Sequence, residues 1–300
     1  MQFSRIRFQH TRRSCLQLAY SVFTARYLKA SKSTVAPAQV PDIARNIPPR
    51  ATRALTGSQF AQSVSNLDRQ QREHAILGQV LEGNMPCFLR KLTPVTLRGE
   101  VAGGETVTAT IFVIPEYLAI GSDSDFLRIP MDLHTAMAIA NRFGFCLPTK
   151  KIVDAIYHQS TSRFTPQPLP AGPRMTSTEY YRHHNEIVDD QSRKRGFRLG
   201  ALVSGHKKDV VLTNRLNSNP GRIAIYGWHR ETGVPIQPLS TVHGADYADY
   251  SHGIRLVAAM AVIGGRLRSV QDILRDAVFS KVLSDEGPIH MSAAFANAQA

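Results

Sequence analysis

The stretch Val95–Val113, VTLRGEVAGGETVTATIFV, decides the predicted fold class. From Val107 to Val113, apolar residues occupy every second position, which is the period of a strand with one buried face. Gly103-Gly104 separates this run from the apolar run before it, so the spacing predicts a β-hairpin. An antiparallel pair at this point favours a mainly antiparallel sheet over a parallel sheet built from alternating βαβ units.

Helical and strand-like patterns alternate irregularly on both sides of this hairpin. Asp132 has the position of an N-cap and Gly144 that of a C-cap, so one helix is expected between them. The order of elements predicts an α+β fold of mainly antiparallel sheet with flanking helices. We expect two short helices over 58–83 and further helices over 132–143, from 147–149 onward, over 178–195 and over 269–286, and strands over 117–120, 126–129, 199–203, 209–213, 222–226 and 253–263.

Composition shifts divide the chain into five parts. Residues 1–53 are predicted to form a disordered or targeting leader, and residues 54–164 an N-terminal α+β lobe. Four prolines in TPQPLPAGP mark residues 165–177 as a connection between two lobes. Residues 178–291 would form a C-terminal α+β lobe that carries the site, and residues 292–300 a frayed tail.

The net charge of +13 is concentrated in the leader. Residues 1–53 hold ten Lys/Arg and one acid, whereas the rest of the chain holds 26 Lys/Arg and 22 Asp/Glu. A folded part this close to neutrality lacks the broad basic face of a phosphate-backbone binder, so no nucleic-acid partner is expected. A weaker alternative is a nucleic-acid protein that binds through its basic leader.

The leader also bears on localisation. Arg12-Arg13 precedes a modestly apolar run, and Ala36-Pro37-Ala38 has the pattern of a cleavage site, which together favour export to a secreted or periplasmic location. The alternatives are a mitochondrial transit peptide and a tail without a targeting role. No apolar run approaches the roughly 18 residues of a transmembrane segment. Cys87 and Cys146 are either a disulfide or two buried thiols.

Histidines gather in residues 225–257, IYGWHRETGVPIQPLSTVHGADYADYSHGIRLV. Histidine titrates near neutral pH and commonly acts as a general acid or base. We expect His243 and His252 to transfer protons and Asp249 to orient them. Arg255 is the candidate for contact with an oxyanion or a carboxylate.

The same segment offers ligands for a metal. Zinc, or another divalent metal, would need three or four His, Cys or Asp/Glu ligands. The candidate ligands are His206, His229, His243, Asp246 and His252. A metal site, a non-metal acid–base site and purely structural histidines remain three open alternatives, because the spacing matches no established metal motif.

Four further residues are candidates for substrate binding. Tyr226 and Trp228 flank a glycine, which would allow a flat ligand or a sugar ring to approach closely, and Tyr250 could stabilise developing charge. Lys207, or Lys208 in its place, could bind a carboxylate or a phosphate. The alternative is that the aromatic residues pack in the core and that the lysine is solvated.

Two short fragments are similar to motifs of cell-wall enzymes. Residues 241–249 resemble the zinc-binding SxHxxGxAxD stretch of D-alanyl-D-alanine dipeptidases, with Asp246 at the glycine position and Tyr250 at the aspartate position. Residues 251–256, SHGIRL, resemble the SHGCIRL of L,D-transpeptidases, but Ile254 directly follows Gly253 and the nucleophilic cysteine is absent. Each fragment covers about ten residues, so no catalytic role is transferred from either family.

These patterns predict an exported hydrolase that acts on a polar polymer, such as cell-wall peptide or glycan. Its His/Asp cluster would be metal-dependent or work by general acid–base chemistry. The alternative is a non-catalytic protein that binds a ligand or a partner through an aromatic and histidine-rich surface. An enzyme needs two of the histidines near one water or substrate atom, whereas a binding protein needs an open aromatic face.

Overall fold

A computed structural model describes residues 43–101 and 103–290, so most of the predicted leader and all of the predicted tail lie outside the described residues. Every described residue belongs to one compact unit. The predicted α+β class with mainly antiparallel sheets is confirmed. None of the described helices is long and apolar enough to cross a membrane.

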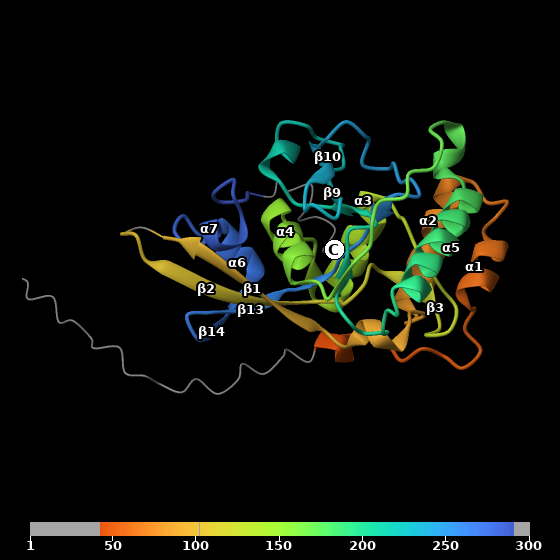
Figure 1. Ribbon diagram of the computed structural model, residues 1–300, viewed down its shortest axis with the longest axis horizontal. Helices are drawn as coiled ribbons and strands as arrows, with labels where there is room; N and C mark the ends of the chain where they lie inside the picture. The colour runs from red at the N-terminus through yellow and green to blue at the C-terminus, as the bar shows by residue number, and fades with distance from the viewer. Residues whose placement is uncertain (1–42, 102, 291–300) are drawn as a thin grey trace, which may run out of the picture. The chain divides into compact units, whose positions relative to one another are not determined.

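The predicted hairpin forms the centre of a six-stranded sheet. Strand β1 (Thr93–Glu100) pairs with β2 (Thr106–Val113) in antiparallel register, with Thr93 opposite Val113. Figure 1 shows these two long strands with α4, α6 and α7 nearby. The other strands of this sheet are β5 (Phe145–Cys146), β12 (Val257–Ala258), β13 (Met260–Ile263) and β14 (Arg266–Ser269). Their order across the sheet is β14-β13-β2-β12-β5, and β1 pairs with β2 outside this path.

This sheet joins the two expected lobes. Val257 of β12 pairs with Val113 of β2, so segments on both sides of the proline-rich connection share hydrogen bonds. The largest buried apolar cluster likewise runs from Ile47 to Ile289. Residues 165–177 therefore connect segments that share one sheet and one core. Cys87 and Cys146 are both free thiols.

Local capping signals explain most helix boundaries. Thr56 and Asp68 form capping boxes at the starts of α1 (Gly57–Ser63) and α2 (Arg69–Leu81). Asp132 accepts a hydrogen bond from the Thr135 amide, and Gly144 adopts a left-handed conformation at the other end of the helix between them. The other long helices are α3 (Leu133–Phe143), α4 (Lys150–Gln159), capped by Thr149, and α5 (Thr178–Lys194), capped by Ser177.

The predicted last helix is interrupted. It forms as α6 (Val270–Arg275) and α7 (Ser280–Leu283). The Asp276 carboxylate accepts hydrogen bonds from the amides of Val278 and Phe279, which offers the backbone an alternative to continued helix. Short 3-10 turns occur at η1 (Ile43–Asn46), η2 (Cys87–Arg90), η3 (Pro173–Thr176) and η4 (Asn214–Leu216).

A second, four-stranded sheet of order β10-β9-β8-β11 carries most of the histidine-rich segment. Its β8 and β11 run parallel, with Lys208 opposite His252. The expected strand 222–226 begins later, because Arg222 instead forms an isolated bridge with Gly244. The strands are β8 (Lys208–Val210), β9 (Ile225–His229), β10 (Pro235–Ser240) and β11 (His252–Gly253); two small pairs are β3 (Ala119–Gly121) with β4 (Phe126–Arg128) and β6 (Ser162–Arg163) with β7 (Val203–Ser204).

Candidate functional site

Three of the four predicted catalytic residues lie together, and we call Lys208, His243, Tyr247, Asp249 and His252 the acid–base cluster. The ring centroids of His243 and His252 are 6.3 Å apart. His243 stacks on Tyr247 at 4.2 Å between centroids, and Tyr247 lies 5.7 Å from His252. An atom placed between the two histidine rings would therefore be within about 3–5 Å of both.

Asp249 is the carboxylate of this cluster, and its orientation is fixed. Its Oδ1 accepts hydrogen bonds from the Ser251 amide at 2.8 Å and from the Ser251 hydroxyl at 2.5 Å. Its Oδ2 accepts one from the Tyr247 hydroxyl at 3.2 Å and lies 3.9 Å from His252 Nε2. The carboxylate can therefore orient His252 or stabilise its protonated form.

Burial and charge set the protonation of these groups. Burial opposes the ionisation of Asp249, but the charge of His252 and the hydrogen bonds from Ser251 outweigh it and lower the pKa of Asp249. Burial lowers the pKa of His252 to about 4, against the attraction of Asp249. Burial also lowers the pKa of His243. Both histidines are thus neutral at pH 7, and each can accept a proton.

Trp228 adjoins the cluster in a strained backbone conformation. Its φ is 57°, and it is the one non-glycine residue with a positive φ among residues 43–101 and 103–290. A bulky residue in this region costs energy, and such strain concentrates at functional sites. The Lys208 Nζ lies 4.9 Å from the centre of the Trp228 ring, which connects the strained strand to the cluster.

Aromatic residues predicted to bind substrate are buried. Trp228 is 5% exposed, Tyr226 4% and Tyr250 2%. Tyr250 uses its hydroxyl to accept a hydrogen bond from the Leu169 amide. These three side chains form no open aromatic face, so they do not favour the alternative of a non-catalytic binding surface.

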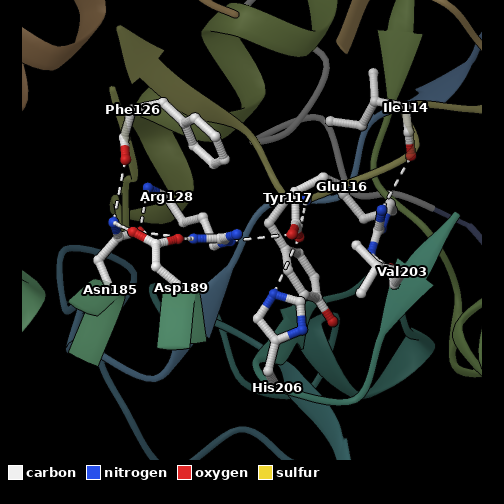
Figure 2. Close-up of polar contacts among 10 residues, drawn as sticks. Ile114, Glu116, Tyr117, Phe126, Arg128, Asn185, Asp189, Val203 and His206 are labelled. Atoms are coloured by element: carbon white, nitrogen blue, oxygen red, sulfur yellow. Dashed lines mark hydrogen bonds and ion pairs between the residues drawn. The ribbon is translucent and has the colours of Figure 1, made fainter. Parts of the chain in front are cut away.

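His206, a predicted metal ligand, instead lies at the end of a buried chain of charges. Its Nε2 is 3.0 Å from Glu116 Oε1, and Glu116 Oε2 is 3.0 Å from Arg128 Nε. Arg128 Nη1 continues to Asp189 Oδ1 at 2.7 Å and to Asn185 at 3.0 Å. Figure 2 shows Arg128 between Asp189 and Glu116, with His206 on the far side of Glu116.

Opposite charges keep Glu116 and Arg128 ionised although both side chains are buried. Burial alone would raise the pKa of Glu116, but the charges of His206 and Arg128 hold it well below its usual range. The carboxylates of Glu116 and Asp189 raise the pKa of Arg128 despite burial. Burial lowers the pKa of His206 more than Glu116 raises it. Arg128 and Asp189 also line a pocket of about 450 Å³.

Arg255, the fourth predicted catalytic residue, has different neighbours. Its guanidinium is 0% exposed and donates hydrogen bonds to the carbonyls of Ile114 (3.0 Å) and Val203 (2.6 Å). Its Cζ lies 4.3 Å from the centre of the Tyr117 ring, whose hydroxyl donates to Asp209. These contacts join β8 to the segment after β2, which gives Arg255 a structural role in this arrangement.

His229, another predicted ligand, pairs with Asp154 of α4 at 3.1 Å. The Tyr226 hydroxyl donates to the same carboxylate at 2.7 Å, and Lys150 Nζ lies 3.0 Å from its other oxygen. Burial would raise the pKa of Asp154, but these hydrogen bonds lower it. Tyr226 and Lys150 line a second pocket, of about 460 Å³.

Asp246 and Lys207, the remaining predicted residues, have other ion-pair and hydrogen-bond partners. Asp246 forms an exposed ion pair with Arg69 at 2.6 Å. Lys207 is buried and donates from Nζ to the Tyr250 carbonyl at 2.5 Å. Burial lowers the pKa of Lys207 to about 7. Three of the five proposed metal ligands, His206, His229 and Asp246, thus lie apart from His243 and His252. The described part of the chain holds no group of three or more His, Cys, Asp or Glu side chains suited to a metal.

Several residues of these clusters were not among the predicted ones. Tyr247 lies within two residues of the predicted Asp246 and Asp249, so the local pattern could have included it. Glu116 and Arg128 each interrupt an apolar run, in VIPEYLAI and FLRIP, and a lone charge in such a run signals a buried ion pair. Asp154 gave no such signal, because an acid on a helix is ordinarily solvated.

No model of a known protein family, no curated protein and no solved structure matches this chain.

Proposed function

We propose that this chain is a hydrolase that acts on a polar polymer by general acid–base chemistry in the acid–base cluster. The observation that carries the proposal is the convergence of two neutral histidines, His243 and His252, beside the ionised carboxylate of Asp249. Among residues 43–101 and 103–290, both ring nitrogens of buried His252 lack a hydrogen-bond partner, so they are available to a water molecule or a substrate.

In the proposed reaction, His252 removes a proton from a water molecule held between the histidine rings. Asp249 stabilises the imidazolium that results, since its Oδ2 faces His252 Nε2. The imidazolium of His252 then gives this proton to the leaving group, while the half-buried His243 accepts a hydrogen bond from the attacking water. The bond between the attacked centre and the leaving group breaks as the bond to the water oxygen forms.

The acid–base form is favoured over the metal-dependent form by the ligand geometry. Three or four ligands are needed to hold zinc, and of the five candidate side chains only His243 and His252 lie together, since Asp246, His206 and His229 pair with other residues. The two forms are separated by the metal content of the purified full-length chain. Stoichiometric zinc or another divalent metal that is lost on His243→Ala substitution would contradict the acid–base form.

The test of activity uses the full-length chain and a panel of peptidoglycan, acidic glycans and neutral glycans, with release of amines or reducing ends as the readout. The substitution His252→Gln should lower kcat by about 100-fold or more, which is the usual contribution of general acid–base groups. The control is His183→Gln, because His183 is an exposed histidine on α5. Equal rates for the two folded variants would refute the role of His252.

The polymer substrate is consistent with export, which we propose on the basis of the twin arginines and the small-residue cleavage pattern in the leader. The expected result is a shorter mature chain outside the cytoplasm. An N-terminal sequence that begins at residue 1 in the cytoplasmic fraction would contradict export and leave the catalytic proposal intact.

A further inference from the structure

Lys208 is a half-buried cation that forms no close ion pair with the described residues. Within residues 43–101 and 103–290, no Asp or Glu oxygen lies within 4.0 Å of its Nζ, and the ammonium instead lies over the Trp228 ring. Burial lowers the pKa of Lys208, which reflects the same loss of hydration. An anion beside Nζ would compensate for that loss.

The carboxylate of Asp249 compensates for only part of this loss, because its charge raises the pKa of Lys208 less than burial lowers it. Asp249 already accepts hydrogen bonds from the Ser251 amide, the Ser251 hydroxyl and the Tyr247 hydroxyl. Two other cations act on the same region, since Lys207 affects the pKa of His252 and Arg222 affects that of His243. Lys208, Lys207 and Arg222 thus outnumber the carboxylate of Asp249 around the two neutral histidines, which favours an anionic ligand.

The geometry points to Lys208 as the residue that binds a carboxylate of the substrate, and to an acidic glycan as that substrate; this inference rests on the function proposed above. Lys208 is opposite His252 in the sheet, so a carboxylate bound there would lie next to the proposed reacting centre. A lysine binds a carboxylate as a compact point charge.

The choice of a glycan follows from the rings at the outer side of the cluster. His243 and Tyr247 are stacked with an interplanar angle of 13°, and both are half-buried, so part of this pair of rings is open to solvent. Flat aromatic surfaces with polar edges suit the faces of sugar rings, which combine C–H groups with hydroxyls. An acidic glycan supplies a sugar ring and a carboxylate on the same unit.

The experiment is calorimetric binding of trigalacturonate and of its methyl ester to the full-length chain. The two probes have the same rings and differ in the charge of the carboxyl group. We expect the ester to bind about tenfold or more weaker than the acid, because the charge-assisted contact is lost. Substitution Lys208→Met should weaken the acid by a similar factor and leave the ester unchanged, whereas Lys208→Arg should largely retain binding of the acid.

The matched control is Lys91→Met, which removes the same charge at an exposed position after η2. Equal affinity for acid and ester, or equal losses in Lys208→Met and Lys91→Met, would overturn the inference. Binding of triglutamate through Lys208 without binding of trigalacturonate would show a peptide ligand and overturn the choice of a glycan.

Binding and cleavage separate this inference from the proposed hydrolase. Trigalacturonate that binds through Lys208 but is never cleaved would support the carboxylate site and contradict the hydrolase. Cleavage that depends on His252 but has the same KM in Lys208→Met would support the hydrolase and contradict the carboxylate site.

Discussion

Replacing Glu116 with Gln tests whether the buried chain of charges holds the centre of the fold. Glu116 is 0% exposed, with Arg128 Nε at 3.0 Å and His206 Nε2 at 3.0 Å on its two oxygens. The amide keeps one acceptor oxygen but leaves Arg128 with a weaker counter-charge. Removing one partner of a buried pair costs about 3–5 kcal/mol, and we expect the lower end because Asp189 remains on Arg128.

This loss should appear as a lower melting temperature and should depend on pH. For a domain of this size about 3 kcal/mol lowers Tm by roughly 6–12 °C. The pKa of folded Glu116 lies below its unfolded value, so its ionisation stabilises the fold above the unfolded pKa of about 4.3. That stabilisation is lost as pH falls through the folded pKa. The difference between the wild-type protein and Glu116→Gln should therefore shrink below about pH 4.

Thermal unfolding followed by circular dichroism, at pH 7 and at about pH 3, provides the assay. The control is Glu186→Gln on α5, where the carboxylate is 62% exposed and 3.6 Å from Arg182, and where no measurable shift is expected. A Tm change below about 2 °C for Glu116→Gln at pH 7 would refute the view that Glu116 is the necessary counter-ion of Arg128.

Two further predictions concern the cluster and its supports. Burial lowers the pKa of His252 to about 4 from an unfolded value near 6.5, so between these pH values the unfolded chain binds a proton more readily than the folded one. Lowering the pH across this range should therefore reduce the free energy of unfolding by up to about 1.4 kcal/mol per pH unit. When that free energy is measured by urea unfolding and plotted against pH, His252→Gln should show a shallower slope than the wild-type protein. An unchanged slope would contradict a neutral His252. In Gly253→Ala the new Cβ would lie 2.6 Å from Tyr117 Cδ1 and 2.7 Å from Lys207 Cβ, so the free energy of unfolding should fall by about 1–3 kcal/mol. The control is Gly78→Ala, where the new Cβ meets nothing within 4 Å and should stabilise α2 slightly. Equal effects of the two alanines in urea unfolding would show that the packing around Gly253 can relax.

Local signals predicted the parts of the fold that depend on neighbours in sequence. Asp132 and Gly144 gave the bounds of α3, and Gly103-Gly104 gave the β1–β2 hairpin. The interruption at Asp276 was missed, because apolar spacing over 270–278 outweighed the capping chemistry of one aspartate. Pairing of β12 with β2 joins residues far apart in the chain, and no local periodicity specifies such a partner.

The same distinction applies to the site. His243, Asp249 and His252 lie within ten residues, so their proximity could be expected from the sequence. The partners of His206 and His229 could not, because Glu116 and Asp154 come from segments that only tertiary folding brings near. Arg255 follows His252 closely in sequence, yet it lies between β11 and β12, and its side chain contacts backbone carbonyls of the core.

Trp228, the tryptophan with the strained backbone, can serve as an intrinsic fluorescence probe of this protein. Trp228 is the only indole among 300 residues, so the whole of the tryptophan emission reports on one buried ring. The Lys208 ammonium lies over that ring, and a ligand that draws the ammonium away would alter the local electric field at the fluorophore. Emission wavelength and intensity should thus follow occupancy of the neighbouring cluster in solution, without a label and without turnover.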